Sequence, residues 1–431
     1  MKQCLFVFSL SVILMYGFSV EAGILGEETD CSQWEARTSN PNWSCIKASN
    51  WAGSCIPGRL FEEWNCLEVD SDAVLCDEDR PFNMTVYFST SGMNFDCNNQ
   101  VIDHQWKEGD TKHSGMRLPQ RRSVSNINIQ NCTIRNVGRY GINLKRFFRG
   151  EQLDGPMNGH RNIEIRDIDI INSRQTGIYV GQNSRYVTMN DVYIERAYSG
   201  IYLEAGSTHS YIVNSTITET TDREAISVDS SMYNTIEYCT FDNNKGGIHL
   251  YKNCGETRGQ VCPIRRKYSA SNNVIRGNRF QGDAVEVAWR QYKLYAVGHC
   301  IGIDILGFWR DRSDNNQIYD NTFVDGADLY VKDGPNTVYG NNFSDSDVIL
   351  GKNAPVGDSP FDLKGNVAEN RFDSGEIFFD TNDDIYEYLA IFNNVDGRGQ
   401  CLDVESMNTC SAPTVLWGDN ILPAGIVTVV Y

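Results

Sequence analysis

Apolar and polar residues alternate with a period of two along most of the chain, and short polar turns interrupt the alternation at regular intervals. This is the period of a β-strand, in which successive side chains point to opposite faces. One recurring half-motif is a strand that ends in Ile or Phe, as at residues 129–134 and 236–241. The other is Gly or Ala, then Ile, any residue, and Leu or Val, as at residues 200–203 and 247–250. The pattern predicts short strands separated by Gly, Asn and Asp turns.

The half-motifs return from residue 126 to about residue 376, once in roughly two dozen residues. This interval is too short for a strand plus a crossover helix, but it suits two or three short strands per turn of a solenoid. We therefore predict an all-β fold, a right-handed parallel β-helix solenoid, whose inward residues stack at a strand spacing of about 4.8 Å. Asparagines at one corner should also stack, in the row Asn278, Asn321, Asn341 or Asn342, and Asn370.

The segments outside the repeat predict the domain organisation. Residues 1–22 have a short basic start, an apolar run and small residues before a cleavage position after Ala22, which is the pattern of a secretory signal peptide. Residues 23–100 are rich in Cys and Trp and are predicted to form an N-terminal cap and first turn. Residues 101–379 are assigned to the β-helix and residues 380–431 to a C-terminal cap, because the open ends of a solenoid need to be covered.

Cysteine usage agrees with a secreted, extracellular protein. Of the 14 cysteines only Cys4 lies in the signal peptide, so an odd number remains. The density of cysteines in residues 23–100 predicts disulfides, and the pairs Cys254/Cys262 and Cys401/Cys410 could each close a small loop. The odd count requires at least one free thiol or an intermolecular bridge. Five triplets fit the glycosylation signal, at Asn42, Asn83, Asn131, Asn214 and Asn342.

The formal net charge is −18 and the pI is about 4.8. Such a surface repels nucleic acid and anionic membranes, so we expect neither as a partner. It also repels a polyanionic glycan, unless a local basic patch or a bound cation reverses the field. We expect a monomer.

The outward positions of the Gly-Ile-x-Leu strands carry the candidate chemistry. If Ile and Leu point inward, the residues two and four places after the Gly point outward. Successive turns would then present a ladder of titratable side chains next to a long basic insert. The predicted catalytic residues are Glu204, Asp229, His249, Tyr251 and Lys252, and the predicted substrate-binding residues are Lys145, Tyr179, Tyr202, Arg265 and Arg266.

Three chemistries fit this ladder. In β-elimination, Tyr, His or Lys acts as base and acid beside a uronate carboxylate that cations neutralise. Glu204 and Asp229 could then hold Ca²⁺ through oxygen ligands. In hydrolysis, Glu204 and Asp229 would themselves be the acid and its partner, one turn of about 5 Å apart. In C5-epimerisation, the same base and acid would work from opposite faces of one sugar carbon.

Residues 225–231 and 247–253 resemble the core turns of β-helix polysaccharide lyases of the alginate lyase/chondroitinase B type. The wider repeat, over about residues 126–376, also resembles pectate lyases, mannuronan epimerases and the general parallel β-helix repeat family. The resemblance implies a pectate lyase-like superfold and an enzyme that acts on a polysaccharide.

The first interpretation is therefore a secreted polysaccharide lyase that acts on a uronate-containing glycan, with Ca²⁺ as a candidate cofactor. The alternatives are a glycoside hydrolase, a C5-epimerase, and a non-catalytic protein that binds glycans through Tyr179, Tyr202 and Tyr330. Every β-helix has a solvated polar face, but an acid pair, a His, two Tyr and a basic loop on adjacent turns favour a site.

Overall fold

The computed structural model describes residues 66–76, 81–105, 113–120, 122–146, 159–251, 268–282, 285–287, 313, 315–331, 336–351, 366–368, 370–374, 377–380, 389–390, 401–403, 408–410 and 427–430. Within these ranges every regular element is a strand. No helix there is long and apolar enough to cross a membrane. The signal peptide predicted at residues 1–22 and the pair Cys254/Cys262 lie outside the described residues.

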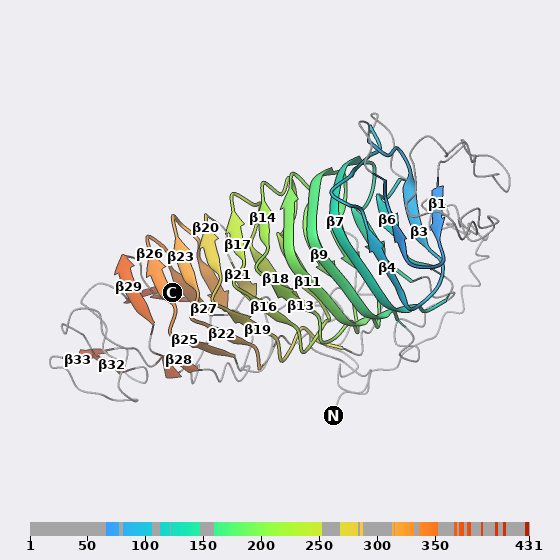
Figure 1. Cartoon of the computed structure of the whole chain (residues 1–431). Helices are drawn as coiled ribbons and strands as arrows, with labels where there is room; N and C mark the ends of the chain where they lie inside the picture. The colour runs from blue at the N-terminus through green and yellow to red at the C-terminus, as the bar shows by residue number, and fades with distance from the viewer. Residues whose placement is uncertain are drawn as a thin grey trace, which may run out of the picture.

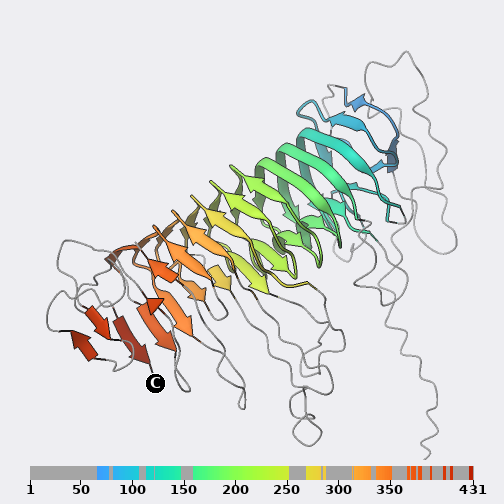
Figure 2. The same ribbon diagram turned by 90° about the horizontal axis from the view of Figure 1, so that it is seen from below.

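The strands stack in parallel along one axis and form an elongated solenoid (Figure 1; Figure 2). One face is a single parallel sheet, called here the site sheet, with one strand from each turn. In stacking order its strands are β1 (Cys66–Val69), β3 (Thr85–Phe88), β6 (Met116–Arg117), β8 (Ile142–Leu144), β10 (Thr176–Val180), β12 (Ser199–Leu203), β15 (Ile226–Asp229), β18 (Ile248–Tyr251), β21 (Val285–Val287), β24 (Leu329–Val331), β27 (Val348–Gly351), β30 (Ile377–Asp380) and β34 (Val427–Val430).

The remaining parallel strands complete each turn around the core. In chain order they are β2 (Ala73–Val74), β4 (Met93–Asp96), β5 (Val101–Asp103), β7 (Ser125–Val137), β9 (Arg161–Ser173), β11 (Arg185–Glu195), β13 (Tyr211–Val213), β14 (Thr216–Thr218), β16 (Thr235–Glu237), β17 (Thr240–Asp242), β19 (Val274–Arg276), β20 (Arg279–Gln281), β22 (Gln317–Tyr319), β23 (Thr322–Val324), β25 (Thr337–Tyr339), β26 (Asn342–Ser344), β28 (Asn366–Ala368), β29 (Arg371–Ser374) and β31 (Leu389–Ala390). The long strand β7 pairs with the two shorter strands β4 and β5, and the long strand β11 pairs with β13 and β14, so each bends around a corner. The long strand β9 lies between β7 and β11 and pairs with both.

The core is a set of vertical stacks, as the repeat predicts. Ile178, Ile201, Ile226 and Ile248 are register partners on successive turns and are fully buried. A second stack is aromatic: Phe241, Phe280, Phe323 and Phe343 follow one another with ring centroids 4.8, 4.8 and 4.7 Å apart. The ring spacing equals the strand spacing, so identical side chains fill identical places in each turn.

The predicted asparagine ladder is confirmed, and Asn341 rather than Asn342 is its member. Amide-to-amide hydrogen bonds of 3.0, 2.9 and 2.9 Å join Asn278, Asn321, Asn341 and Asn370 in that order. A second ladder, which the repeat did not reveal, joins Asn234, Asn273, Asn316 and Asn336 through bonds of 2.9, 3.0 and 3.0 Å. At each tight corner some backbone groups have no partner in a neighbouring strand, and the asparagine side chains hydrogen-bond to them instead.

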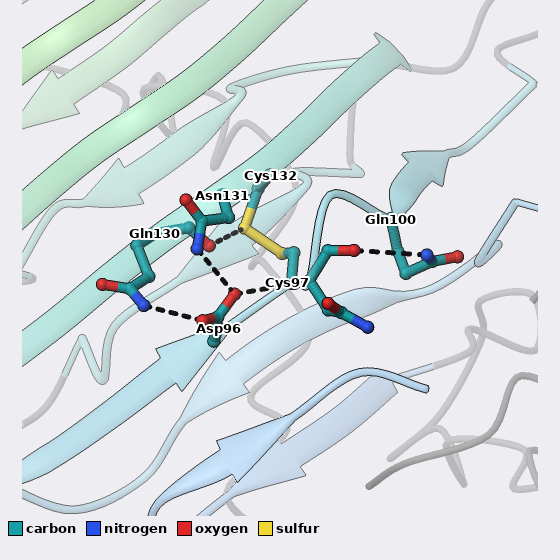
Figure 3. Close-up of a disulfide and its surroundings, with 7 residues drawn as sticks. Asp96, Cys97, Gln100, Gln130, Asn131 and Cys132 are labelled. Carbon is teal, nitrogen blue, oxygen red and sulfur yellow. Dashed lines mark hydrogen bonds between the residues drawn. A yellow bond between two sulfur atoms is a disulfide. The ribbon is translucent and has the colours of Figure 1, made fainter. Parts of the chain in front are cut away.

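Cys97 and Cys132 form a disulfide with a Cα–Cα distance of 4.9 Å, which links two successive turns (Figure 3). Beside it, the Asp96 carboxylate accepts hydrogen bonds from the side chains of Gln130 and Asn131 at 2.7 and 3.0 Å (Figure 3). The predicted presence of disulfides is thus confirmed for this pair.

Cys66 and Cys76 each take part in a disulfide as well. Within the described residues Cys239 is a buried free thiol, in accord with the odd cysteine count. Cys401 and Cys410 face each other in the antiparallel pair formed by β32 (Cys401–Asp403) and β33 (Asn408–Cys410). Their disulfide stays a prediction.

Parallel pairing extends past both predicted boundaries of the β-helix. At the N-terminal end β1 and β3 already pair within the segment assigned to the cap and first turn. At the C-terminal end β34 adds to β30 within the segment assigned to the cap. The domain boundaries and the two caps stay predictions.

Candidate functional site

The candidate site lies on the outward positions of β8, β10, β12, β15 and β18 in the site sheet. The register brings Tyr179, Tyr202, Ser227 and His249 into one column across four turns. The strand ends add a second column, in which Asp229 lies beside Tyr251 on the next turn. The alternation predicted from the sequence is correct, because Ile201 and Leu203 between the outward residues are fully buried.

Three aromatic rings form a continuous stack, called here the tyrosine row. The centroids of Tyr140 and Tyr179 are 5.0 Å apart and those of Tyr179 and Tyr202 are 4.9 Å apart. The Lys145 ammonium lies 5.2 Å from the centre of the Tyr179 ring, a cation–π contact. The structure thus brings together Lys145, Tyr179 and Tyr202, the three described members of the predicted substrate-binding set.

The two predicted acids are held by polar neighbours. Glu204 accepts hydrogen bonds from the backbone and side-chain nitrogens of Gln182 at 3.1 and 3.0 Å. Asp229 accepts one from the Tyr202 hydroxyl and one, at 3.1 Å, from Ser230. We expected both groups on a solvent-facing surface, and this expectation is wrong: Asp229 is 0% exposed and Glu204 is buried. Burial of a carboxylate requires such donors, because the charge has lost its water.

The hydrogen bonds bear on the predicted Ca²⁺ site. Each of the four carboxylate oxygens of Glu204 and Asp229 already accepts a hydrogen bond. Ca²⁺ takes about six to eight oxygen ligands. Among the described residues no group of three or more His, Cys, Asp or Glu side chains could hold a metal ion. The two acids therefore do not fit a Ca²⁺ site by themselves, and no step proposed below uses a metal.

A second cluster centres on Glu224, which the sequence did not single out. Its carboxylate lies 2.9 Å from Nδ1 of His249 and 3.3 Å from Nε of Arg223, and it accepts a 2.8 Å hydrogen bond from Ser227. Arg223 in turn donates a 3.0 Å hydrogen bond to the hydroxyl of Tyr251. The rings of His249 and Tyr251 are stacked with centroids 4.4 Å apart. The His249 imidazole and the Tyr251 phenol thus lie side by side, and each is hydrogen-bonded to a charged side chain, Glu224 and Arg223 respectively.

Electrostatics fix the protonation states of two members of this cluster. Burial alone would raise the pKa of Glu224, but the hydrogen bond and charge of His249 and the charge of Arg223 outweigh it and lower the pKa to about 2. Burial and the nearby Asp229 charge raise the pKa of Tyr251 well above its usual value, although Arg223 opposes the shift. At neutral pH Glu224 is therefore a carboxylate and Tyr251 a neutral phenol.

Burial and charge act in the same way on the tyrosine row. Burial, followed by the charge of Glu204, raises the pKa of Tyr179 well above its usual value. For Tyr202 the causes are burial and then Asp229. Both tyrosines keep their protons at neutral pH and can donate hydrogen bonds.

The described predicted residues gather in two neighbouring groups. Tyr179, Tyr202, Glu204 and Asp229 form one, and His249 and Tyr251 join Glu224 and Arg223 in the other. Lys252, Arg265 and Arg266 lie outside the described residues. Glu224 was missed because the motif search began at the small residue of each Gly-Ile-x-Leu strand. The preceding position holds Tyr140, Thr176, Ser199, Glu224 and Gly246 on successive turns. Its single charged member is the signal that could have found Glu224.

Residues 120–285 match the family model described as "Right handed beta helix region". Together with the parallel register, this match establishes the predicted fold class: the described part of the chain is a right-handed parallel β-helix. No curated protein sequence matches the chain.

Among solved structures the chain is similar to DFA-IIIase from Arthrobacter chlorophenolicus A6 in complex with GF2, with a TM-score of 0.44 and 11% identity over 74% of this chain and 82% of that one. It is similar to alginate lyase from Paenibacillus sp. str. FPU-7, with a TM-score of 0.37 and 12% identity over 78% and 97%. It is also similar to the N-terminal fragment of the bacteriophage Phi29 gene product 12, with a TM-score of 0.42 and 11% identity over 75% and 60%. Likenesses this distant do not indicate an activity for this protein.

Proposed function

We propose that this protein is a secreted enzyme that cleaves a uronate-containing polysaccharide by β-elimination. The observation that carries the proposal is the adjacency of two tuned pairs, His249 with Glu224 and Tyr251 with Arg223. Elimination needs a base for a carbon-bound proton and an acid for the departing oxygen, and these two pairs supply one of each.

His249 is the proposed base. If Nδ1 donates its proton to the Glu224 carboxylate 2.9 Å away, the lone pair lies on Nε2. A carboxylate in this position holds the imidazole in one tautomer and stabilises the imidazolium that forms when the base takes up a proton. Glu224 acts through His249 and is a positioning residue.

Tyr251 is the proposed acid. Its raised pKa keeps the phenol protonated, and the hydrogen bond from Arg223 stabilises the phenolate that remains after proton transfer. The proton on the carbon beside the uronate carboxylate moves to His249, and its electron pair forms a carbon–carbon double bond. The bond from the neighbouring carbon to the glycosidic oxygen breaks, and that oxygen takes the Tyr251 proton. The products are one unsaturated uronate end and one reducing end.

The tyrosine row gives the proposal a place for the polymer. Tyr179 and Tyr202 are partly exposed, and their rings follow the solenoid axis toward the base and the acid. A pyranose has an apolar face that can stack on such rings, while the hydroxyls of the tyrosines can bond to the sugar. The expected partner is thus a polysaccharide, and secretion rests on residues 1–22. We keep the expectation of a monomer.

Hydrolysis is the second candidate, and the charge of the site favours it. Glu204, Glu224 and Asp229 are three carboxylates, and of the described cations only Arg223 lies against one of them, while Lys145 lies over the Tyr179 ring. Such a site suits a neutral glycan better than a polyanion. Glu204 and Asp229 are on adjacent strands, about 5 Å apart by strand spacing, which is near the separation found in retaining hydrolases.

The test is a screen of the purified mature protein against alginate, polygalacturonate, chondroitin sulfate and neutral xylan, each with Ca²⁺ and with a chelator. Ultraviolet absorbance of unsaturated uronate and reducing ends are followed together. Elimination predicts that both signals rise on a uronate polymer and that His249→Ala and Tyr251→Phe lose them. Reducing ends without absorbance would refute elimination and support the hydrolase. Sugar epimers without chain cleavage would indicate a C5-epimerase, and silence in all assays would refute a cleaving enzyme.

A further inference from the structure

A second set of exposed rings lies outside the candidate site, at the corner that follows the site sheet. Tyr186, His209 and Tyr233 occupy the same corner position on three successive turns, as the register of the adjoining residues shows. The ring centroids are 5.2 Å apart between Tyr186 and His209 and 5.3 Å apart between His209 and Tyr233. These three residues are called here the outer aromatic row.

The rings of the outer aromatic row face solvent. Tyr186 is 50% exposed and Tyr233 is 49% exposed, and His209 between them is also exposed. They belong to no core cluster. Burial in the fold therefore does not explain why large aromatic side chains stand at this corner.

The backbone at this corner makes the choice of residues more unusual. All three adopt left-handed φ values, 56° at Tyr186, 57° at His209 and 59° at Tyr233. Asn adopts this conformation readily, whereas a bulky side chain does so at a cost. On the turns before and after the row the same corner position is Asn, namely Asn126, Asn162, Asn272 and Asn315, all with positive φ. The three middle turns thus replace the residue that suits this backbone with two tyrosines and a histidine, although nothing in the packing of the corner requires the larger side chains.

The three turns carry the middle of the candidate site, namely Tyr179, Tyr202 and Asp229. Tyr186 follows β10, His209 follows β12 and Tyr233 follows β15, each within six residues of the strand end. The outer aromatic row therefore runs parallel to the tyrosine row, one corner away. A polymer lying along the solenoid axis next to the site would pass over it.

We propose that the outer aromatic row is an accessory binding surface for a chain of pyranose sugars. The rings recur once per turn along the axis, which matches the one-directional repeat of a linear glycan. The rings lie one above the other along the axis, His209 and Tyr233 stacked, so their exposed parts offer a ribbon of apolar ring carbons together with the Tyr hydroxyls and His nitrogens that can hydrogen-bond to sugar hydroxyls. The identity of the glycan, a uronate-containing chain, rests on the proposed function. The row holds the polymer and takes no part in bond cleavage.

The test replaces the rings with the residue that neighbouring turns already use. The triple variant Tyr186→Asn, His209→Asn, Tyr233→Asn removes all three rings and keeps a residue that suits a left-handed corner, so it should fold as well as the wild type. The matched control is Tyr238→Asn. Tyr238 is 58% exposed with a φ of 54°, but it stands at a different corner, between Asn214 and Gly277.

Binding is measured by affinity electrophoresis in gels that contain alginate, polygalacturonate or chondroitin sulfate. We expect retardation of the wild type in one of these gels, an affinity at least tenfold weaker in the triple variant, and no change in the control. Cleavage of the polymer should slow in the triple variant, while cleavage of a short oligosaccharide should not. Equal retardation of triple variant and control, or no retardation of the wild type in any gel, overturns the proposal.

The outcomes separate this proposal from that of the enzyme. If retardation in the gel depends on the outer aromatic row but the protein releases no product, the accessory surface stands and the cleaving enzyme is refuted. If the protein releases product but the triple variant binds the polymer as well as the control does, the cleaving enzyme stands and the accessory surface is refuted.

Discussion

Glu224→Gln is the substitution that most directly tests the proposed base. The amide keeps the shape of the side chain and removes its charge. The pKa of Glu224 falls from its usual 4.5 to about 2, which corresponds to about 3 kcal/mol of preference for the ionised form in this site. If the same charge stabilises the imidazolium of His249 in the transition state, its loss should lower kcat by about 100- to 300-fold. KM should change little, because Glu224 acts through His249.

The same charge makes a prediction about stability and pH. A folded-state pKa below the usual value adds stability above pH 4.5, and this stability is lost as the pH falls toward about 2. Wild type should therefore be more stable than Glu224→Gln at pH 6 by up to about 3 kcal/mol. The two melting curves should converge as the pH is lowered from 4.5 to 2. Differential scanning calorimetry at several pH values measures this directly.

The control is Glu195→Gln, the same chemical change at a glutamate that pairs with Arg196 at the surface, 2.5 Å away. A surface pair contributes about 0–1 kcal/mol, so rate and melting should stay near the wild type. An unchanged kcat in Glu224→Gln would refute the role given to the His249–Glu224 pair. A lowered kcat whose pH profile matches that of the wild type would indicate a structural role only.

Three further variants test the fold and the substrate. Asn321→Leu should lower the free energy of unfolding by about 3 kcal/mol in a denaturant titration, because it leaves buried amides of the adjoining turns without partners. Replacing Cys97 and Cys132 with Ala opens a link between residues 35 apart and should cost about 3–4 kcal/mol in the same measurement. Arg265→Ala combined with Arg266→Ala should raise KM for a uronate polymer severalfold and leave that for xylan unchanged, and an equal effect on both would contradict the predicted neutralising role.

The fold could be predicted because each turn places the same kinds of side chain at the same inward and corner positions. One inward Ile per strand, one Phe stack and one corner asparagine are visible as a period in the sequence, and the structure places them in register. The ladder through Asn234 and Asn273 was missed because these residues precede the Ile-to-Phe half-motif, whereas Asn278 and Asn321 lie inside it. The extension of the pairing to β34 was missed because residues 427–430 are separated from the repeat.

The site could be predicted only in part. A period of two gives the direction of a side chain, and it correctly placed Tyr202 and His249 in one outward column. It gives no information about what covers that side chain, so the burial of Asp229 was not expected. Glu224 lies in the turn before the strand, where no period applies. Its contact with His249 depends on the stacking of two turns, which is a property of the three-dimensional fold.

The charge of the site links its chemistry to its substrate. Two unit charges about 5 Å apart near a protein surface interact by about 3 kcal/mol, so three carboxylates with only Arg223 and Lys145 to offset them oppose a uronate. Elimination from a uronate therefore requires further positive charge beside the described cluster. The candidates are Lys252, which directly follows β18 in the chain, and Arg265 and Arg266 further along. Hydrolysis of a neutral glycan has no such requirement, but it leaves the ionised Glu224 and its bond to His249 without a catalytic use. The tuned pair argues for elimination and the net charge argues against it. Groups with strongly shifted pKa values cluster at functional sites, so the tuned pair carries more weight.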